Sequence, residues 1–298
     1  MSSCDDVRSL PSASYEEETG WSFHKPAPPQ WGVTAQNFAD NLEFVGPAVQ
    51  EEGYHVWGSS PIVGPDGKVH LFVSRWPVEK TFSPGWHQFS EIAHYVGESP
   101  VGPFQYKRTV LQGTGVDSDW DEKAPHNPSV YKVGGQYVLL YIANSGSTTN
   151  QSIGMLTAPT LDGPWQKIKL YPDKPGLLVD HSKVPKVWNH RSRKQITNPA
   201  LIRRSDGSLL VYYAAYYADG ASYLTGGYGV AVSRNGGVSG PYTHHPRRMD
   251  IRGDAFPEDG NAFRMNNQYY FLFMGHYAHK GFLLESTDGI DFAEKYYT

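Results

Sequence analysis

The stretch HNPSVYKVGGQYVLLY, residues 126–141, contains the unit from which the chain is built. In it a polar residue and a proline precede a short aliphatic strand, a Gly-Gly turn follows, and an apolar strand returns. Glycine-bearing pairs of this kind favour two-residue hairpins. Related phrases begin at Ser59, SSPIVGPDGKVHLF, and at Thr197, TNPALIRRSDGSLLVYY. The sequence therefore predicts an antiparallel hairpin that recurs along the chain.

The hairpin recurs with a long period. Pro61, Pro128, Pro199 and Gly260 occupy the same place in four units, which begin about 60 to 70 residues apart. Each unit continues with a third apolar strand, and the first three then reach GPF, GPW or GPY at the start of a fourth. A four-stranded antiparallel meander with this period is typical of a β-propeller blade, whose first strand lies nearest the axis. Two stacked sheets are the competing all-β fold, but they give no reason for the period.

The number of blades depends on the two ends of the chain. The sequence stops at DFAEKYYT, where a further blade could begin, and NLEFVGPAV from Asn41 supplies at least one more strand. We expect an all-β, five-bladed propeller whose last blade is incomplete or is closed by the N-terminal segment, with a ring of four as the alternative. Residues 1–20 are expected to form a disordered tail, and residues 21–298 a single propeller domain.

Composition excludes several classes of protein. The formal charge is −4 over 298 residues and no lysine or arginine run stands out, so the electrostatic footprint of a nucleic-acid-binding protein is missing. Cys4 is the single cysteine, which rules out an internal disulfide and a cysteine-based zinc site. No apolar run reaches about 18 residues, so no membrane span is expected.

The cellular location is left open, because residues 1–20 do not look like a signal peptide. One alternative is a secreted or periplasmic protein whose signal peptide is absent from this chain.

Phrases from several units resemble one known group of enzymes. They are VWGSSPIVGPDGKVHLFVSRWP, SEIAHYVGESPVGPF, HNPSV, NQSIGMLTAP and TNPAL. From about Val56 to Asp291 the chain is similar to the five-bladed propeller glycoside hydrolases of family 43 and its relatives, families 32, 62 and 117. The resemblance implies hydrolysis of glycosidic bonds in plant, algal or microbial oligosaccharides or polysaccharides. It implies no required cofactor, and it allows a structural Ca²⁺ or Na⁺ ion in the central channel.

Glycoside hydrolysis needs two carboxyl groups, a base for water and an acid for the leaving oxygen, about 6.5 to 9.5 Å apart in an inverting enzyme. The resemblance implies an aspartate before the proline of several first strands, pointing into the central funnel. Here Ser60, Asn127 and Asn198 precede the prolines, and only Asp259, before Gly260, is an acid. Asparagine and serine hydrogen-bond sugar hydroxyls but do not deprotonate water. The usual carboxylates are thus absent from these positions.

The reaction would then draw on other carboxylates in the funnel. Glu258 precedes Asp259 at the start of the fourth first strand, and Asp121 lies in the loop DSDWDEKAPHNP that leads into the second. We expect Asp259 or Glu258 to act with Asp121 as the acid and base pair. For each of these three residues, the competing interpretation is a carboxylate that contacts only solvent.

The rim of the predicted central funnel supplies further residues that could bind the sugar. Aromatic side chains there offer stacking platforms, and polar side chains beside the first strands offer hydrogen bonds to hydroxyls. Arg75, the next-to-last residue of FVSRW, would bind the carboxylate of a uronic acid through two parallel hydrogen bonds, although a structural salt bridge explains it equally well. The predicted substrate-binding residues are Trp57, Ser59, Ser60, Arg75, Glu91, Trp120, His126, Asn127, Asn198 and His276.

Two further functions fit the same sequence. A polysaccharide lyase would use a histidine and a tyrosine as base and acid, and would act on a uronic acid. A non-catalytic sugar-binding propeller would explain the missing aspartates. No histidine pair has the H-E-x-x-H spacing of a zinc site, so the metal content is left undetermined.

Overall fold

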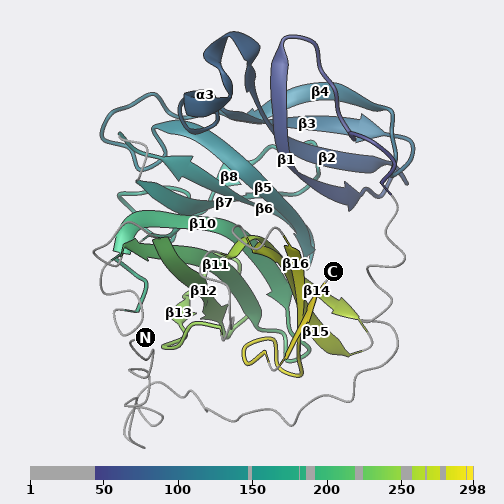
Figure 1. The fold of residues 1–298 in the computed structure, drawn as a ribbon. Helices are drawn as coiled ribbons and strands as arrows, with labels where there is room; N and C mark the ends of the chain where they lie inside the picture. The colour runs from purple at the N-terminus through teal and green to yellow at the C-terminus, as the bar shows by residue number, and fades with distance from the viewer. Residues whose placement is uncertain are drawn as a thin grey trace, which may run out of the picture.

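The computed structural model describes residues 44–146, 150–180, 182–185, 192–218, 224–249, 257–265, 267–275, 280–292 and 294–297. Within these ranges the chain forms four consecutive antiparallel meanders, which we call sheets I to IV. Figure 1 shows them in chain order, from the purple strands of sheet I to the yellow strands of sheet IV.

Each sheet takes its strands in the order of the sequence. Sheet I contains β1 (Tyr54–Val63), β2 (Val69–Pro77), β3 (Glu91–Gly97) and β4 (Phe104–Leu111). Sheet II contains β5 (Lys123–Val133), β6 (Gln136–Asn144), β7 (Gln151–Ala158) and β8 (Gln166–Lys167), and β9 (Leu177–Val179) also pairs with β7.

Sheets III and IV repeat the arrangement. Sheet III contains β10 (Ser192–Arg203), β11 (Leu209–Ala218), β12 (Leu224–Ser233) and β13 (Thr243–His244). Sheet IV contains β14 (Pro257–Met265), β15 (Gln268–Gly275), β16 (Lys280–Ser286) and β17 (Glu294–Tyr297). The 3₁₀-helix η2 (Val78–Lys80) and the helix α3 (Phe82–Gln88) lie between β2 and β3.

The tight turns follow the residues that the sequence offers for them. Gly67, Gly134 and Gly207 have φ values of 77°, 60° and 89°, and Asn267 has a φ of 64°. Gly134 and Asn267 lie in two-residue connections, whereas Gly67 and Gly207 lie in the longer connections 64–68 and 204–208. Both kinds of turn use a left-handed residue, which glycine and asparagine adopt most easily. Each first strand therefore returns as the predicted hairpin.

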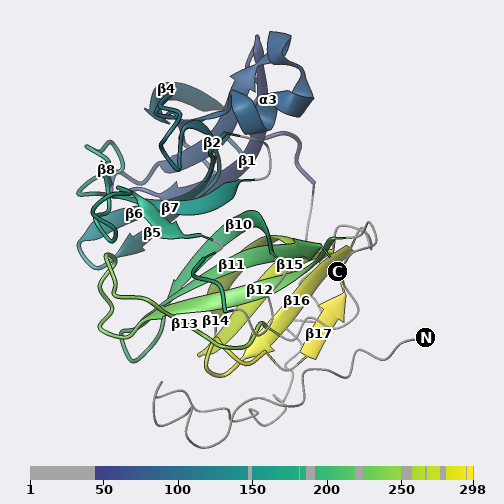
Figure 2. The same cartoon turned by 90° about the vertical axis from the view of Figure 1, so that its left-hand side faces the viewer.

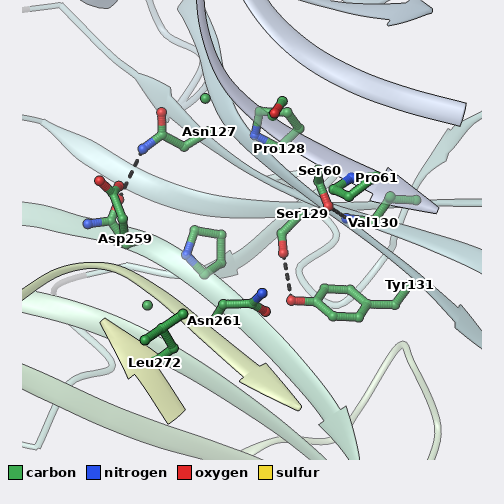
Figure 3. A pocket seen from close by; sticks show the side chains of 15 residues that line it. Ser60, Pro61, Asn127, Pro128, Ser129, Val130, Tyr131, Asp259, Asn261 and Leu272 are labelled. Carbon is green, nitrogen blue, oxygen red and sulfur yellow. Dashed lines mark hydrogen bonds between the residues drawn. The ribbon is translucent and has the colours of Figure 1, made fainter. Parts of the chain in front are cut away.

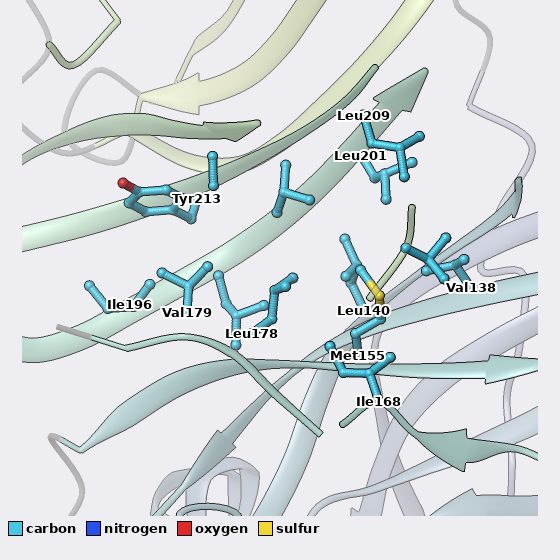
Figure 4. Packing of buried hydrophobic residues seen from close by; sticks show 14 of the residues in the cluster. Val138, Leu140, Met155, Ile168, Leu178, Val179, Ile196, Leu201, Leu209 and Tyr213 are labelled. Carbon is cyan, nitrogen blue, oxygen red and sulfur yellow. The ribbon is translucent and has the colours of Figure 1, made fainter. Parts of the chain in front are cut away.

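Apolar side chains fill the space between neighbouring sheets. Leu139 and Tyr141 of β6 face sheet I and pack with Phe72. Leu140 of β6 faces sheet III instead and packs in the cluster of Figure 4, where Met155 also lies. Because both faces of β6 are covered, its sequence YVLLYIA is an unbroken apolar run instead of an alternating one.

The first strands lie together at the centre. Strand β5 packs beside β1 and β10, and β10 packs beside β14; Figure 2 shows the sheets from the side. Sheets II and III are also joined by one parallel pairing, between Gln195 and Gln151. The residues of the four first strands thereby come to surround a common axis.

The repeated meander is confirmed, and two expectations about its surroundings change. The segment EKYY forms β17 and pairs with β16, so the C-terminal residues complete sheet IV and do not begin another blade. Residues 78–88, which carry no strand pattern, form η2 and α3. Residues 44–53 contain no strand, and the predicted tail at 1–20 lies outside the described residues. The fifth blade stays a prediction.

Candidate functional site

All four first strands carry one extra residue at the same place. The register shifts where β1 pairs with β2, β5 with β6, β10 with β11 and β14 with β15, as in a β-bulge. The residue that opens each bulge is left-handed: φ is 55° at Gly58, 45° at Asn127, 49° at Asn198 and 52° at Asp259. Glycine, asparagine and aspartate tolerate this conformation best. The backbone therefore restricts these four positions before any chemistry is considered.

The bulges correct the alignment of the first unit. Gly58, and not Ser60, is the counterpart of Asn127, because the register of β1 breaks at Gly58. Ser60 lies two residues further on, where its Oγ accepts a hydrogen bond from the Val130 N–H at 3.0 Å. Pro61 belongs to the regular part of β1, so a match made on prolines places the first unit two residues out of step.

The bulges converge on an axial pocket of about 630 Å³. Figure 3 shows side chains of β1, β5 and β14 around it. Among the described lining residues Asp259 is the only carboxylate, and the other polar side chains are those of serine, asparagine and tyrosine. The lining residues are Gly58, Ser59, Ser60, Pro61, Asn127, Pro128, Ser129, Val130, Tyr131, Asn198, Pro199, Asp259, Gly260, Asn261 and Leu272.

Two side-chain amides from neighbouring sheets meet in the pocket. Asn127 Nδ2 donates to Asn198 Oδ1 at 3.1 Å, and the Asn127 N–H donates to Ser74 Oγ at 2.9 Å. Asn127 Oδ1 has no hydrogen-bond partner within the described part of the chain. A Cβ atom at position 58 would lie 3.0 Å from this oxygen, so Gly58 leaves the space that the amide occupies. This oxygen is buried, so the pair keeps its unused acceptor behind the pocket wall and not on the pocket surface.

Five of the predicted site residues lie on this pocket, namely Asp259, Ser59, Ser60, Asn127 and Asn198. Asp259 is exposed to solvent. Its neighbour Glu258 is half-buried and is not among the described lining residues, so it does not share the pocket with Asp259.

Sequence reasoning missed three polar residues of the lining, Ser129, Tyr131 and Asn261. Ser129 and Asn261 each stand two residues after a bulge, which is also the place of Ser60 in the first unit. An alignment on the bulge residues would have found them, because it places these three side chains in one column. Ser129 Oγ lies 2.6 Å from the Tyr131 hydroxyl, as Figure 3 shows.

Asp121 does not face the pocket, contrary to the prediction. Its carboxylate lies 2.6 Å from Lys167 Nζ and accepts a hydrogen bond from the Tyr141 hydroxyl at 3.2 Å. Lys167 belongs to β8, an outer strand of sheet II. Burial and the nearby Asp121 raise the pKa of Tyr141. The loop before β5 therefore ties its carboxylate into an ion pair at the outer part of the sheet, away from the axis.

Arg75 and Glu91 pair with each other in sheet I and are not among the described lining residues of the pocket. Arg75 Nη1 donates to Glu51 at 2.7 Å and Arg75 Nε to Glu91 at 2.9 Å. The guanidinium carbon lies 4.3 Å from the centre of the Tyr54 ring and 4.1 Å from that of Tyr106. Burial alone would lower the pKa of Arg75, but the hydrogen bonds to Glu51 and Glu91 outweigh it and raise the pKa. All of this charge is satisfied inside the protein, so the structural salt bridge is the correct interpretation.

His126 lies in the wall behind the pocket and is fully buried. Its Nδ1 donates to the Ala124 carbonyl at 2.7 Å, and its Nε2 accepts a hydrogen bond from Gln151 Nε2 at 3.2 Å. Burial lowers the pKa of His126 to about 4. Both ring nitrogens are thus occupied, and the expectation that His126 binds a sugar hydroxyl is wrong. His276, the other predicted histidine, lies outside the described residues.

Two predicted tryptophans have different surroundings. Trp120 Nε1 donates to the Pro175 carbonyl at 3.0 Å, and its ring packs 5.7 Å from that of Tyr141, so this side chain stabilises sheet II and does not reach the pocket. Trp57 directly precedes Gly58 at the pocket and is 37% exposed. Trp57 is the more exposed of the two, although neither side chain is among the described lining residues.

Cations and membranes were also considered. The described residues contain no group of three or more histidine, cysteine, aspartate or glutamate side chains arranged to hold a metal. The Ca²⁺ or Na⁺ ion that the family resemblance allows stays a prediction. In the described part of the chain no helix combines the length and apolarity that a membrane crossing requires.

Comparison with known proteins identifies the fold. No protein-family model and no curated protein sequence matches the chain. Among solved structures, a family 117 glycoside hydrolase of the marine bacterium Zobellia galactanivorans has a TM-score of 0.60 at 17% identity, with 81% of this chain and 69% of that chain covered.

Family 43 structures match in the same way. A β-xylosidase/α-arabinofuranosidase from a compost metagenome, in complex with xylotriose, has a TM-score of 0.56 at 14% identity and covers 81% of this chain and 77% of its own. A GH43_1 enzyme of Xanthomonas citri complexed with xylotriose has a TM-score of 0.55 at 15% identity, with coverage of 89% and 80%. The chain has the all-β, propeller-type fold of these glycoside hydrolases.

Proposed function

We propose that this chain, which shares the fold of the family 43 and family 117 enzymes, is a glycoside hydrolase that binds a sugar in the axial pocket. The observation that carries the proposal is the position of Asp259. It is the carboxylate among the described lining residues, and its bulge holds it at the axis beside the amides of Asn127 and Asn198.

The chemistry of the pocket suits a polyhydroxyl ligand. Serine, asparagine and aspartate side chains line the pocket, and these groups accept hydrogen bonds from sugar hydroxyls. Asp259 would take a proton from water as that water attacks the anomeric carbon, and the glycosidic oxygen would leave with a proton from an acid. The described lining residues include no second carboxyl group, so the proposal assigns only the water-activating role.

The test is turnover of an oligosaccharide panel in ¹⁸O-labelled water, followed by mass spectrometry. The wild-type protein is expected to place the label in a new reducing end. Asp259→Asn should lower the rate about 100- to 10,000-fold while the thermal midpoint of unfolding stays unchanged, because general base catalysis contributes a factor of this size. Asp173→Asn, at an exposed turn of sheet II, is the matched control and should retain full activity. Full activity of Asp259→Asn would contradict the assignment.

A sugar-binding protein without turnover is the second candidate. The observation in its favour is that asparagine occupies two of the four bulge positions and glycine a third, where a hydrolase needs carboxylates. Binding of a sugar with no labelled product from any panel member would support it.

The lyase is the weaker alternative. The described lining of the pocket contains no histidine to act as base, and the Tyr131 hydroxyl, whose pKa burial raises, is bonded to Ser129. An unlabelled, unsaturated product in the same experiment would nevertheless establish a lyase.

A further inference from the structure

The bulge that carries Asp259 differs from those of sheets II and III in the residue that follows it. In sheets II and III a proline follows the bulge asparagine, whereas in sheet IV Gly260 follows Asp259. Asp259 and Gly260 together lie opposite one residue of β15, Phe273, because the register shifts between Glu258 and Asn261. A proline has no backbone N–H and fixes its own φ, but a glycine brings a donor and a freer backbone. The bulge of sheet IV therefore needs another group to bond that donor.

Tyr228 of β12 supplies this group from the neighbouring sheet III. Its hydroxyl accepts a hydrogen bond from the Gly260 N–H at 2.7 Å. The Tyr228 side chain is fully buried, and its ring centroid lies 4.7 Å from that of Phe271. Because a close-packed core holds the ring in place, the position of the hydroxyl is fixed as well. The backbone next to Asp259 is thus hydrogen-bonded to a rigid part of sheet III.

Gly260 also leaves the space that this tyrosine occupies. A Cβ atom at position 260 would lie 2.6 Å from the Tyr228 hydroxyl oxygen and 2.4 Å from Phe271 Cζ. Contacts this short would force the rings or the strand to move, so a residue with a side chain does not fit here. Tyr228 and Gly260 therefore depend on each other: the glycine admits the ring, and the ring bonds the N–H that the glycine brings.

The equivalent positions in sheets I and II contain a different pair. In each sheet, a row of paired residues runs from the residue before the bulge, through the second strand, to the third strand. Its third-strand member is Ile92 in sheet I, Ile153 in sheet II and Tyr228 in sheet III. Ile92 packs in a cluster with residues of sheet II, and Ile153 in a cluster with residues of sheet III. An isoleucine thus faces each sheet whose bulge has a proline, and the tyrosine faces the sheet whose bulge has a glycine.

We propose that Tyr228 is a positioning residue for Asp259: by accepting the Gly260 N–H, its hydroxyl holds the bulge in the conformation that places the Asp259 carboxylate at the pocket. This inference rests on the proposed function, because it takes Asp259 to be the group that activates water. Asp259 has a left-handed φ of 52°, a conformation that persists only where the surroundings support it. A displacement of about 1 Å at a reacting group can lower a rate roughly 100-fold, so support of the bulge bears directly on turnover.

The test compares Tyr228→Phe with Tyr212→Phe, and both variants keep a buried ring. Tyr212 is the matched control, because it is fully buried in the same core cluster and its hydroxyl donates to the Gly289 carbonyl, which does not line the pocket. Each variant loses one buried hydrogen bond, so the two should lose comparable thermal stability. In the labelled-water assay, Tyr228→Phe should lower kcat about 10- to 100-fold and change KM less than about twofold, whereas Tyr212→Phe should leave both unchanged.

A double variant separates positioning from a general loss of stability. In the Asp259→Asn background, Tyr228→Phe should lower the rate no further, because the hydroxyl acts through the carboxylate that this background lacks. Equal fold losses of rate in the two backgrounds overturn the inference. Wild-type kcat in Tyr228→Phe, together with the expected loss in Asp259→Asn, also overturns it and leaves the proposed function standing. Full activity of Asp259→Asn, or a wild-type protein that cleaves no sugar of the panel, overturns both.

Hydrogen exchange of the Gly260 amide tests the bond itself and needs neither a variant nor a substrate. The wild-type amide is expected to exchange slowly in NMR spectra of the ¹⁵N-labelled full chain, because its hydrogen is bonded to a buried hydroxyl. Exchange at the rate of an unstructured peptide overturns the inference, whatever the fate of the proposed function. In Tyr228→Phe the Gly260 amide should exchange faster, and in Tyr212→Phe it should exchange as in the wild type.

Discussion

The axial pocket and the charged network around Arg75 both contain polar side chains of the sheets. They differ in whether those side chains are bonded inside the protein or accessible to a ligand. In the network, Arg75 donates to Glu51 and Glu91 and lies between two tyrosine rings. In the pocket, Asp259 is exposed and lies on the lining with Asn127 and Asn198. A polar side chain can bind a ligand only where solvent reaches it, and Arg75 and Glu91 are instead shielded inside the protein.

The largest expected effect would come from the network. Arg75→Met should lower the free energy of unfolding by about 3 to 5 kcal/mol, because it leaves two carboxylates in a largely buried place without their cation. Urea unfolding followed by fluorescence measures this. Arg108→Met is the control: Arg108 is 45% exposed beside Asp162, and surface pairs contribute less than about 1 kcal/mol. Equal destabilisation by the two variants would contradict the contrast between network and surface.

His126, in the wall behind the pocket, should make the free energy of unfolding depend on pH. Its folded pKa is about 4, below the ordinary value of 6.5, so between these values the unfolded chain binds a proton that the folded chain does not. The stabilisation is therefore complete above about pH 6.5 and is lost as the pH falls towards 4, by about 3 kcal/mol. His126→Asn, whose amide can still donate to the Ala124 carbonyl, should make this part of the pH profile less steep in urea titrations; His94 and His244, whose pKa values burial also lowers to about 4, keep contributing to it. An unchanged slope would show that His126 is not the group responsible.

Asn127→Gly tests the pocket with little disturbance of the fold. Glycine keeps the left-handed backbone and removes only the amide, so the free energy of unfolding should change by less than about 1 kcal/mol. Sugar affinity should fall by about 1 to 3 kcal/mol, measured by calorimetry, because the pocket loses an amide side chain of its lining. Asn127→Leu is the comparison, since a branched residue at a φ of 45° adds about 1 to 2 kcal/mol of backbone strain. Unaltered sugar affinity in the glycine variant would remove Asn127 from the site.

The smallest expected effect concerns a residue that lies on the pocket but has its hydrogen bond elsewhere. Ser60 Oγ accepts from the Val130 N–H, so Ser60→Ala should cost about 1 kcal/mol of stability and leave sugar affinity unaltered. Thermal unfolding and calorimetry on the same sample compare the two quantities. A loss of affinity larger than the loss of stability would mean that Ser60 binds the ligand directly.

Local sequence signals predicted most of the fold. Gly134, Gly207 and their neighbours identified the hairpins, because a left-handed turn residue has few alternatives. The period identified the meanders, because each repeat must bury both of its faces against its neighbours. β17 and α3 were missed, since EKYY is too short to show alternation and the seven residues of α3 are too few to show a helical period.

The sequence by itself determined the repeated sheets and the place of Asp259, Asn127 and Asn198 in the first strands, which begin several residues earlier than expected in β5 and β10. Only the tertiary structure decided that Gly58 is the fourth member of that set, because register is a property of two paired strands and proline spacing does not report it. It also decided that Asp121 and Arg75 are satisfied by partners far along the chain, at Lys167 and Glu51. Which polar groups remain available to a ligand depends on contacts between distant segments, and a sequence pattern does not contain those distances.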